Sequence, residues 1–209
     1  MEILCHRGWW ERPEEKNSPD ALHRAFAAGL GVETDLRDFS GAVVVSHDPP
    51  TQKGLDLDGL LALHATAPHA TLALNVKADG LAVPAAKALA DHGVNGAAFA
   101  FDMAVPDQLQ WLCTDVATFT RHSDVEPDPV LYLASDGVWL DDFGPLRWWT
   151  AGTVRRHLDA GKRVAVVSPE LHGRDHRDAW AEIFTAGLHH DDRLALCTDL
   201  PAEALEVFR

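Results

Sequence analysis

Short apolar segments alternate with amphipathic segments from one end of this chain to the other, and this alternation limits the possible folds more than any other feature. Each apolar segment is bounded by polar residues or glycine, which is typical of buried parallel strands. The segments predicted as strands are residues 3–5, 31–36, 71–76, 97–101, 117–120, 137–140, 163–167 and 194–197. Eight strands joined by helices predict an α/β fold, the (β/α)8 TIM barrel. A doubly wound open sheet is the alternative, although no G-x-G-x-x-G motif follows the first strand.

Helix signals lie between these strands. Ser18 is a good N-cap residue, and Pro19 suits the first position of a helix. The predicted helices are residues 19–28, 81–91, 153–159, 179–186 and 202–208. A turn at Ser40-Gly41, just before the apolar residues 43–45, predicts a hairpin. We therefore expect a small antiparallel strand on the barrel mouth, which carries His47 back over it.

The length and charge of the chain bound its function. Its 209 residues suit one domain, residues 1–209. The net charge of −14 repels nucleic acid and anionic lipids, so we expect no nucleic-acid partner. No apolar run approaches the roughly 18 residues that span a bilayer, and the first strand starts close to Met1, so we expect no integral membrane association and no signal peptide. Three widely spaced cysteines are typical of reduced core thiols in a cytoplasmic protein.

Polar side chains follow nearly every predicted strand. In a TIM barrel the active site lies at the carboxyl ends of the strands. A buried scaffold gains nothing from many polar groups in one place unless they pair with one another or bind something. These residues are His6, Arg7, Glu33, Asp35, Asn75, Lys77, Asp102, Arg121, Asp141, Glu170 and Asp199.

Several short motifs form a further pattern along the chain. They are His6-Arg7-Gly8, Asn17-Ser18, Ala25-Phe26, Gly31, Glu33, Asp35, His47-Asp48 and the closing Cys197-Thr198-Asp199-Leu200-Pro201. In order and spacing these motifs resemble the glycerophosphodiester phosphodiesterase family, within the phospholipase-C-like phosphodiesterase superfamily. The resemblance covers the first quarter of the chain and its last dozen residues. The segment from Val167 to His172 is similar to a small bacterial branch. The resemblance implies a TIM barrel, a divalent metal ion and hydrolysis of a phosphodiester.

A metal site is expected at Glu33 and Asp35. These residues are two apart on a strand, so their side chains share one face, and two such carboxylates suit Mg²⁺ or Ca²⁺. The alternative is a pair neutralised by a basic side chain such as Arg37. The resemblance implies a third carboxylate in a Glu-x-Lys pattern, but this chain has Asn75-Val76-Lys77. We expect the metal ligands to be Glu33, Asp35, Asn75 and a compensating carboxylate, Glu170, with Asp141 and Asp102 as alternatives.

His6 and His47 are the expected catalytic pair, because imidazole exchanges protons near neutral pH. Which of them is the acid and which the base stays open, as does the nucleophile, water or a hydroxyl of the substrate. Arg7 and Lys77 are expected to bind the phosphate, with salt bridges to the carboxylates as the alternative. Arg121 is a further expected contact to the phosphate or the substrate. Trp9 is expected to contact the substrate, with packing against neighbouring loops as the alternative.

The sequence thus predicts a metal-dependent phosphodiesterase acting on a small-molecule glycerophosphodiester or related alcohol phosphodiester. Two alternatives stay open. A non-catalytic phosphate-binding or ligand-binding barrel is favoured by Asn75 in place of an acidic ligand. A lysophospholipase-D-like enzyme is disfavoured by the acidity of the chain and by the lack of an apolar anchor. The sequence specifies neither the alcohol groups nor the oligomeric state.

Overall fold

The computed structural model describes residues 1–208, apart from the side chain of Asn95. In this part of the chain the strands are β1 (Glu2–His6), β2 (Gly31–Phe39), β3 (Ala42–Val45), β4 (Leu72–Val76), β5 (Ala98–Phe101), β6 (Ala117–His122), β7 (Gly137–Leu140), β8 (Arg163–Val167) and β9 (Leu194–Thr198). The α-helices are α1 (Pro19–Ala27), α2 (Leu57–His64), α3 (Ala82–Asp91), α4 (Val105–Trp111), α5 (Ala151–Asp159), α6 (Arg177–Thr185) and α7 (Pro201–Val207).

The strands form one sheet in the order β1-β9-β8-β7-β6-β5-β4-β2-β3, and β1 also pairs with β2. The order of hydrogen-bonded strands therefore closes on itself, with β3 outside the ring. Neighbouring strands of the ring, such as β2 with β4 and β8 with β9, pair in parallel. The fold is a TIM barrel with one additional strand, as the alternation in the sequence predicts.

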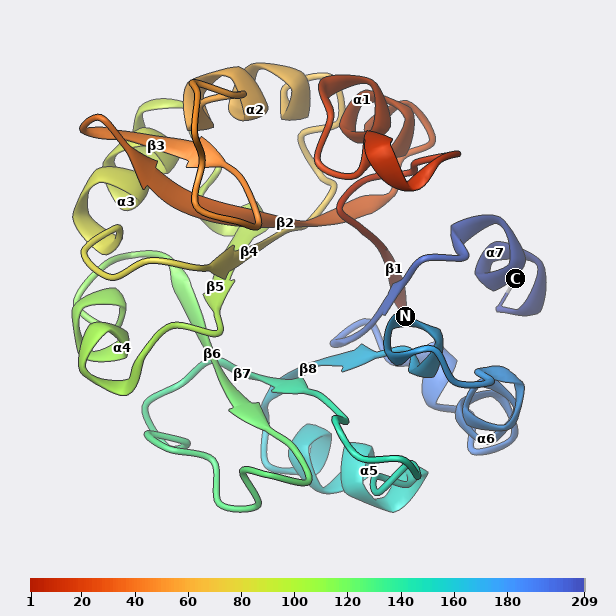
Figure 1. The fold of residues 1–209 in the computed structure, drawn as a ribbon. Coiled ribbons are helices and arrows are strands. Elements are labelled where there is room, and N and C mark those ends of the chain that lie inside the picture. The colour runs from red at the N-terminus through yellow and green to blue at the C-terminus, as the bar shows by residue number, and fades with distance from the viewer. Residues whose placement is uncertain (209) are drawn as a thin grey trace. The chain divides into compact units, whose positions relative to one another are not determined.

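The chain divides into two compact units. The N-terminal unit comprises Cys5–Thr118. The C-terminal unit comprises residues 1–4 together with residues 119–208. Helices α1 to α4 lie outside β2, β4 and β5 in the N-terminal unit (Figure 1). Helices α5 and α6 lie outside β7 and β8 in the C-terminal unit (Figure 1).

Helix α1 of the N-terminal unit begins as its sequence predicts. The Ser18 hydroxyl accepts a hydrogen bond from the Ala21 amide at 3.2 Å, and Pro19 occupies the first turn. The side chains of Leu22 and Phe26, four residues apart on one face, are fully buried. Because α1 packs against β2 and α2, its N-terminus fixes the loop that enters it from β1.

The predicted hairpin is present and extends β2 beyond the ring. Ser40 and Gly41 both have positive φ angles, 50° and 82°, as a two-residue hairpin turn requires. Leu36 pairs with Val45, and Phe39 pairs with Ala42. The polar residues after β3 are therefore carried back toward the carboxyl end of β2.

The C-terminal unit has a strongly apolar sheet. All four residues of β7 and all five of β9 are buried. Helix α5 begins with a capping box between Thr150 and Thr153, and it buries His157. His157 is hydrogen-bonded to His122 and to the Tyr132 hydroxyl, each at 2.9 Å. Burial lowers the pKa of His157 to about 4, so both nitrogens of a neutral imidazole take part in this network.

Some details differ from the sequence analysis. Helices α2 and α4 were not predicted, and β2 runs three residues further than expected. All three cysteines are free, but Cys113 is exposed and not a core thiol. Cys5 and Cys197 are buried, and burial raises the pKa of the Cys5 thiol to about 12. Within residues 1–208, none of the helices combines the length and the apolar character needed to span a bilayer.

Candidate active site

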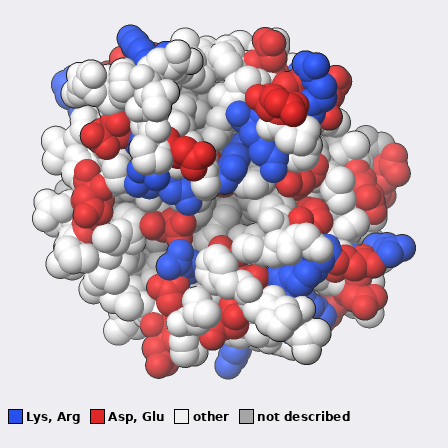
Figure 2. Space-filling view, in the orientation of Figure 1, with Lys and Arg blue, Asp and Glu red and all other residues white. Residues whose placement is uncertain are grey.

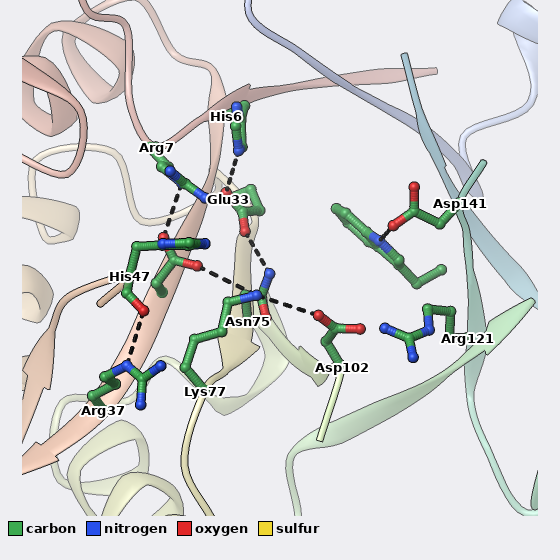
Figure 3. Close-up of polar contacts among 12 residues, drawn as sticks. His6, Arg7, Glu33, Arg37, His47, Asn75, Lys77, Asp102, Arg121 and Asp141 are labelled. Carbon is green, nitrogen blue, oxygen red and sulfur yellow. Dashed lines mark hydrogen bonds and ion pairs between the residues drawn. The ribbon is translucent and has the colours of Figure 1, made fainter. Parts of the chain in front are cut away.

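Strand ends of the N-terminal unit bring together most of the predicted site residues. His6 closes β1 and Arg7 follows it, Glu33 and Asp35 lie on β2, and Asn75 lies on β4 just before Lys77. The register pairs Asp35 with Asn75, which places the carboxylates of β2 next to the amide of β4. Figure 3 shows these side chains directed toward one another. Basic side chains gather over β2, although the whole chain has a net charge of −14 (Figure 2).

The two carboxylates of β2 are almost completely buried. Glu33 is 1% exposed and Asp35 is 0% exposed. Burial, followed by the negative charge of Asp35, raises the pKa of Glu33 to about 7, although His6 and Arg7 act in the opposite direction. The Nε2 atom of His6 lies 3.9 Å from Glu33 Oε2. Two buried carboxylates side by side are unfavourable unless positive charge joins them.

Asp35 is held from one side by two residues of the loop after β1. The Asn17 amide donates a hydrogen bond to Asp35 Oδ2 at 2.8 Å, and Arg7 Nε forms an ion pair with the same oxygen at 3.0 Å. Thr34 orients Asn17 by donating its hydroxyl to Asn17 Oδ1 at 2.8 Å. Asn17 belongs to one of the sequence motifs, but its contact with Asp35 joins residues 18 positions apart and was not predicted from the sequence.

Gly8 is essential to the path of this loop. Its φ angle is 88°, and a Cβ atom built there would lie 2.7 Å from the carbonyl carbon of Ala21. Only glycine allows the backbone to approach α1 so closely at this φ angle. The same turn contains Arg7, whose φ angle of 58° is unusual for a residue with a side chain. The Arg-Gly pair thus gives a tight turn that directs Arg7 toward Asp35.

Three oxygen atoms in this cluster are buried and make no hydrogen bond within the part of the chain that the structure describes. They are Glu33 Oε2, Asp35 Oδ1 and Asn75 Oδ1. The Asn75 amide donates to Glu33 Oε1 at 3.2 Å, which fixes the orientation of its own oxygen (Figure 3). Buried polar atoms are nearly always hydrogen-bonded, so three exceptions in one cluster call for an explanation.

These three oxygens fit a hard divalent cation, because Mg²⁺ and Ca²⁺ bind carboxylate and amide oxygens. A cation would also relieve the repulsion between Glu33 and Asp35. Within residues 1–208, no cluster of three or more His, Cys, Asp or Glu side chains is arranged to hold a metal. The candidate donor set consists of two carboxylates and the amide of Asn75, and its use as a metal site stays a prediction.

His47 lies beyond β3, where the hairpin returns to β2. The backbone amide of Ser46 donates to the carbonyl of Asp35 at 3.0 Å, and Arg37 Nε donates to the carbonyl of His47 at 2.9 Å. The Nδ1 atom of His47 is 2.9 Å from Asp48 Oδ1. Asp48 thus contacts one ring nitrogen of His47, and the catalytic role of this imidazole stays a prediction. The His47 side chain is 45% exposed, whereas that of His6 is 14% exposed.

Lys77 follows β4 and lies between two carboxylates. Its Nζ atom is 3.3 Å from Asp102 Oδ2 and 3.8 Å from Asp35 Oδ1 (Figure 3). Asp102 immediately follows β5, and its φ angle of 69° lies in the left-handed region. The two ion pairs agree with the salt-bridge prediction for Lys77. The phosphate-binding prediction is also compatible with this position, because the Lys77 side chain is 20% exposed and can be reached from solvent.

Three further predicted site residues are the substrate contacts Trp9 and Arg121 and the metal ligand Glu170. Trp9 is part of the loop after β1, is half-buried, and accepts a hydrogen bond from Arg24 on its carbonyl. Arg121 belongs to the C-terminal unit and is paired with Glu126. Glu170, also in the C-terminal unit, accepts hydrogen bonds from the hydroxyls of Ser168 and Thr198. The assignments of Trp9, Arg121 and Glu170 stay predictions.

Solved structures of known proteins match this fold over almost the whole chain. A glycerophosphodiester phosphodiesterase from Agrobacterium tumefaciens matches with a TM-score of 0.73 and 16% identity, over 99% of this chain and 98% of that one. One from Parabacteroides distasonis matches with a TM-score of 0.69 and 17% identity, over 99% and 96%. A Ca²⁺-dependent phosphatidylinositol-specific phospholipase C from Streptomyces antibioticus matches with a TM-score of 0.54 and 12% identity, over 97% and 95%.

No protein-family model and no curated protein sequence matches the chain. At 16% and 17% identity, the structural matches show the fold. The chain therefore has the fold found in solved glycerophosphodiester phosphodiesterases.

Proposed function

We propose that this protein is a metal-dependent phosphodiesterase that hydrolyses a glycerophosphodiester or a related alcohol phosphodiester. The observation that carries the proposal is the set of three buried oxygens, on Glu33, Asp35 and Asn75, that make no hydrogen bond within the described residues. Arg7 and His6 lie against the same carboxylates. A phosphate and a cation are complementary to such a mixed cluster, and the fold is one that known phosphodiesterases use.

The two histidines have complementary roles in this proposal. One imidazole removes a proton from the nucleophile as the new P–O bond forms, and the other protonates the departing alkoxide as the old P–O bond breaks. Asp48 orients the His47 ring through Nδ1, and Glu33 lies beside Nε2 of His6. Arg7 and Lys77 neutralise the phosphoryl oxygens, where negative charge increases in the transition state.

Glu33, Asp35 and Asn75 are the residues that would hold the metal. When bound, Mg²⁺ or Ca²⁺ supplies positive charge to the phosphoryl oxygens. The phospholipase from Streptomyces antibioticus, which shares the fold, is described as Ca²⁺-dependent. Glu170 as a further ligand, and Arg121 and Trp9 as substrate contacts, belong to the same proposal.

Turnover of a substrate panel tests the proposal. The panel contains an activated aryl phosphodiester, glycerophosphodiesters with different alcohols and a lysophospholipid, each assayed with Mg²⁺, Ca²⁺ or a chelator. We expect metal-dependent turnover that the chelator abolishes. Phosphorus NMR of the products distinguishes water from an internal hydroxyl as nucleophile, because only the latter gives a cyclic phosphate first.

The alternative of a non-catalytic binding barrel rests on Asn75, which brings no charge to the metal site. It predicts that inorganic phosphate or a metal ion binds, measured by calorimetry, while every member of the panel stays at the background rate. Background rates with every metal tested would therefore contradict the catalytic proposal and favour binding. Hydrolysis of the lysophospholipid alone would favour the lysophospholipase-D-like alternative.

A further inference from the structure

The side chain of Asp102 points at the ammonium group of Lys77 from an unusual backbone position. Asp102 follows β5 directly, its φ angle is 69°, and its side chain is 17% exposed. Non-glycine residues seldom adopt this left-handed conformation, although Asp and Asn tolerate it better than others. This turn brings Asp102 Oδ2 to 3.3 Å from Lys77 Nζ (Figure 3).

Lys77 has a second carboxylate within reach. Asp35 Oδ1 is 3.8 Å from Lys77 Nζ, it is buried, and it makes no hydrogen bond within residues 1–208. A buried oxygen attracts a cation more strongly than an oxygen of a partly exposed residue, because the surrounding dielectric is lower. The lysine side chain is a flexible chain of four methylene groups. A shift of less than an ångström would therefore bring Lys77 Nζ from 3.8 Å to hydrogen-bonding distance from Asp35 Oδ1.

We propose that Asp102 is a positioning residue that holds Lys77 away from Asp35. This inference rests on the proposed function and concerns how the same site keeps its ligand oxygen available. With Asp102 in place, Asp35 Oδ1 stays open to a cation, and the Lys77 ammonium stays available to a phosphate.

The amide at position 75 makes this arrangement more important. The candidate metal ligands carry two negative charges, those of Glu33 and Asp35, because Asn75 is neutral. The ion pair between Lys77 and Asp35 is long, 3.8 Å, and a direct hydrogen bond between them would neutralise one of the two charges more fully. Asp102 keeps that contact long by offering Lys77 a nearer partner at 3.3 Å, and in this way it compensates for the carboxylate that the third position lacks.

Crystal structures of the metal-free wild type and of Asp102→Asn provide the first test. Asparagine tolerates the left-handed conformation as well as aspartate, so the backbone is preserved while the charge is lost. We expect Lys77 Nζ to move from 3.8 Å to hydrogen-bonding distance from Asp35 Oδ1. A Lys77 ammonium that stays at its wild-type position would overturn the proposal. This result requires neither a bound metal nor activity, so it stands apart from the proposed function.

Calorimetric titration with Ca²⁺ and Mg²⁺ provides the second test. We expect Asp102→Asn to weaken metal binding by about tenfold, within the range found for residues of one salt-bridge network. In a Lys77→Met background the same substitution should have almost no effect, because there is no ammonium to move. An equal loss in both backgrounds would mean that Asp102 acts only as a nearby negative charge, which contradicts the proposal.

A matched control comes from the surface of α3, where Lys87 and Asp91 form an exposed ion pair at 2.5 Å. Asp91→Asn makes the same chemical change in the same unit and should leave both readouts unchanged. If the wild type binds neither metal, the metal dependence in the proposed function is wrong, and the crystal comparison alone decides the role of Asp102.

Discussion

Two pairs of carboxylates at or just after strand ends are used differently, namely Glu33 and Asp35 in the N-terminal unit and Asp141 and Glu170 in the C-terminal unit. In the N-terminal unit, Glu33 and Asp35 each leave one buried oxygen without a hydrogen bond. In the C-terminal unit, both oxygens of Asp141 are occupied. Its Oδ1 is hydrogen-bonded to His172 and to a backbone amide at 2.8 Å each, and its Oδ2 accepts from a tryptophan indole at 3.3 Å.

Glu170 follows the same pattern as Asp141. Its Oε1 accepts hydrogen bonds from the Thr198 hydroxyl and the Asp199 amide, and its Oε2 accepts from the Ser168 hydroxyl. A carboxylate with both oxygens occupied stabilises the fold, whereas one with an unoccupied buried oxygen costs stability and is available to a ligand. Equivalent topological positions therefore do not imply equivalent roles. As a metal ligand, Glu170 would offer an oxygen that already accepts a hydrogen bond, whereas Glu33 Oε2 and Asp35 Oδ1 accept none within the described residues.

The largest expected effect is a loss of kcat when the proposed catalytic histidine of the N-terminal unit, His6, is removed. His6→Ala should lower kcat by about 10²–10⁴-fold with the fold intact, because it removes a proton-transfer group. The measurement is steady-state kinetics on the best substrate of the panel, with circular dichroism as the check on folding. His23→Ala, an exposed position on α1, is the matched control and should retain full activity. Retained activity in His6→Ala would remove His6 from the acid–base pair.

A smaller effect is expected when the missing charge is restored. Asn75→Glu should tighten Ca²⁺ or Mg²⁺ binding by about tenfold or more, because metal affinity rises with the number of charged ligands. Calorimetric titration of wild type and variant measures it. Unchanged affinity would show that the third ligand comes from elsewhere, and a loss of affinity in Glu170→Gln would then identify Glu170.

Replacing a carboxylate by an amide should change the free energy of unfolding in opposite directions at Glu33 and at Glu170. At pH 8, without metal, Glu33→Gln should raise the free energy of unfolding by about 2 kcal/mol, because burial and Asp35 raise the pKa of Glu33 to about 7 and its ionised form is therefore disfavoured in the fold. Glu170→Gln should lower it by about 1–3 kcal/mol, because a hydrogen-bonded carboxylate is lost. Urea denaturation measures both. Equal destabilisation by the two variants would invalidate the comparison.

The smallest expected effect is a pH dependence that belongs to the C-terminal unit. The folded state lowers the pKa of His157 from 6.5 to about 4, so the unfolded chain binds more protons between these values. The contribution of His157 to stability is complete above pH 6.5 and is lost as the pH falls toward 4. Wild type should therefore lose about 1 kcal/mol more than His157→Gln between pH 7 and pH 5, allowing for solvent screening. Parallel pH profiles would contradict this.

The sequence predicted the fold well because buried parallel strands are continuous apolar runs. The prediction missed α2, although Leu57, Leu60, Leu61 and His64 have helical spacing and Asp56 caps the helix. It missed α4, which begins after Ala104 without a side-chain cap, so the local signal was weak. Hairpin chemistry at Ser40-Gly41 correctly gave the strand outside the ring.

The candidate site was predictable as a list of residues but not as a set of contacts. Residue type and position at strand ends identified His6, Arg7, Glu33, Asp35 and Lys77. The bond from Asn17 to Asp35 and the approach of Asp102 to Lys77 join residues 18 and 25 positions apart. Such pairs depend on strand register and on backbone angles, which a single sequence does not specify.

The contact between Gly8 and the start of α1 limits how this protein can be altered by directed evolution. Any side chain at position 8 would push against the backbone of Ala21 and shift the first turn of the helix. Asn17, just before that turn, would move with it and loosen its bond to Asp35. Libraries that vary residue 8 should therefore yield mostly inactive clones, whereas those that vary the exposed residues 11–14 of the same loop should tolerate many substitutions.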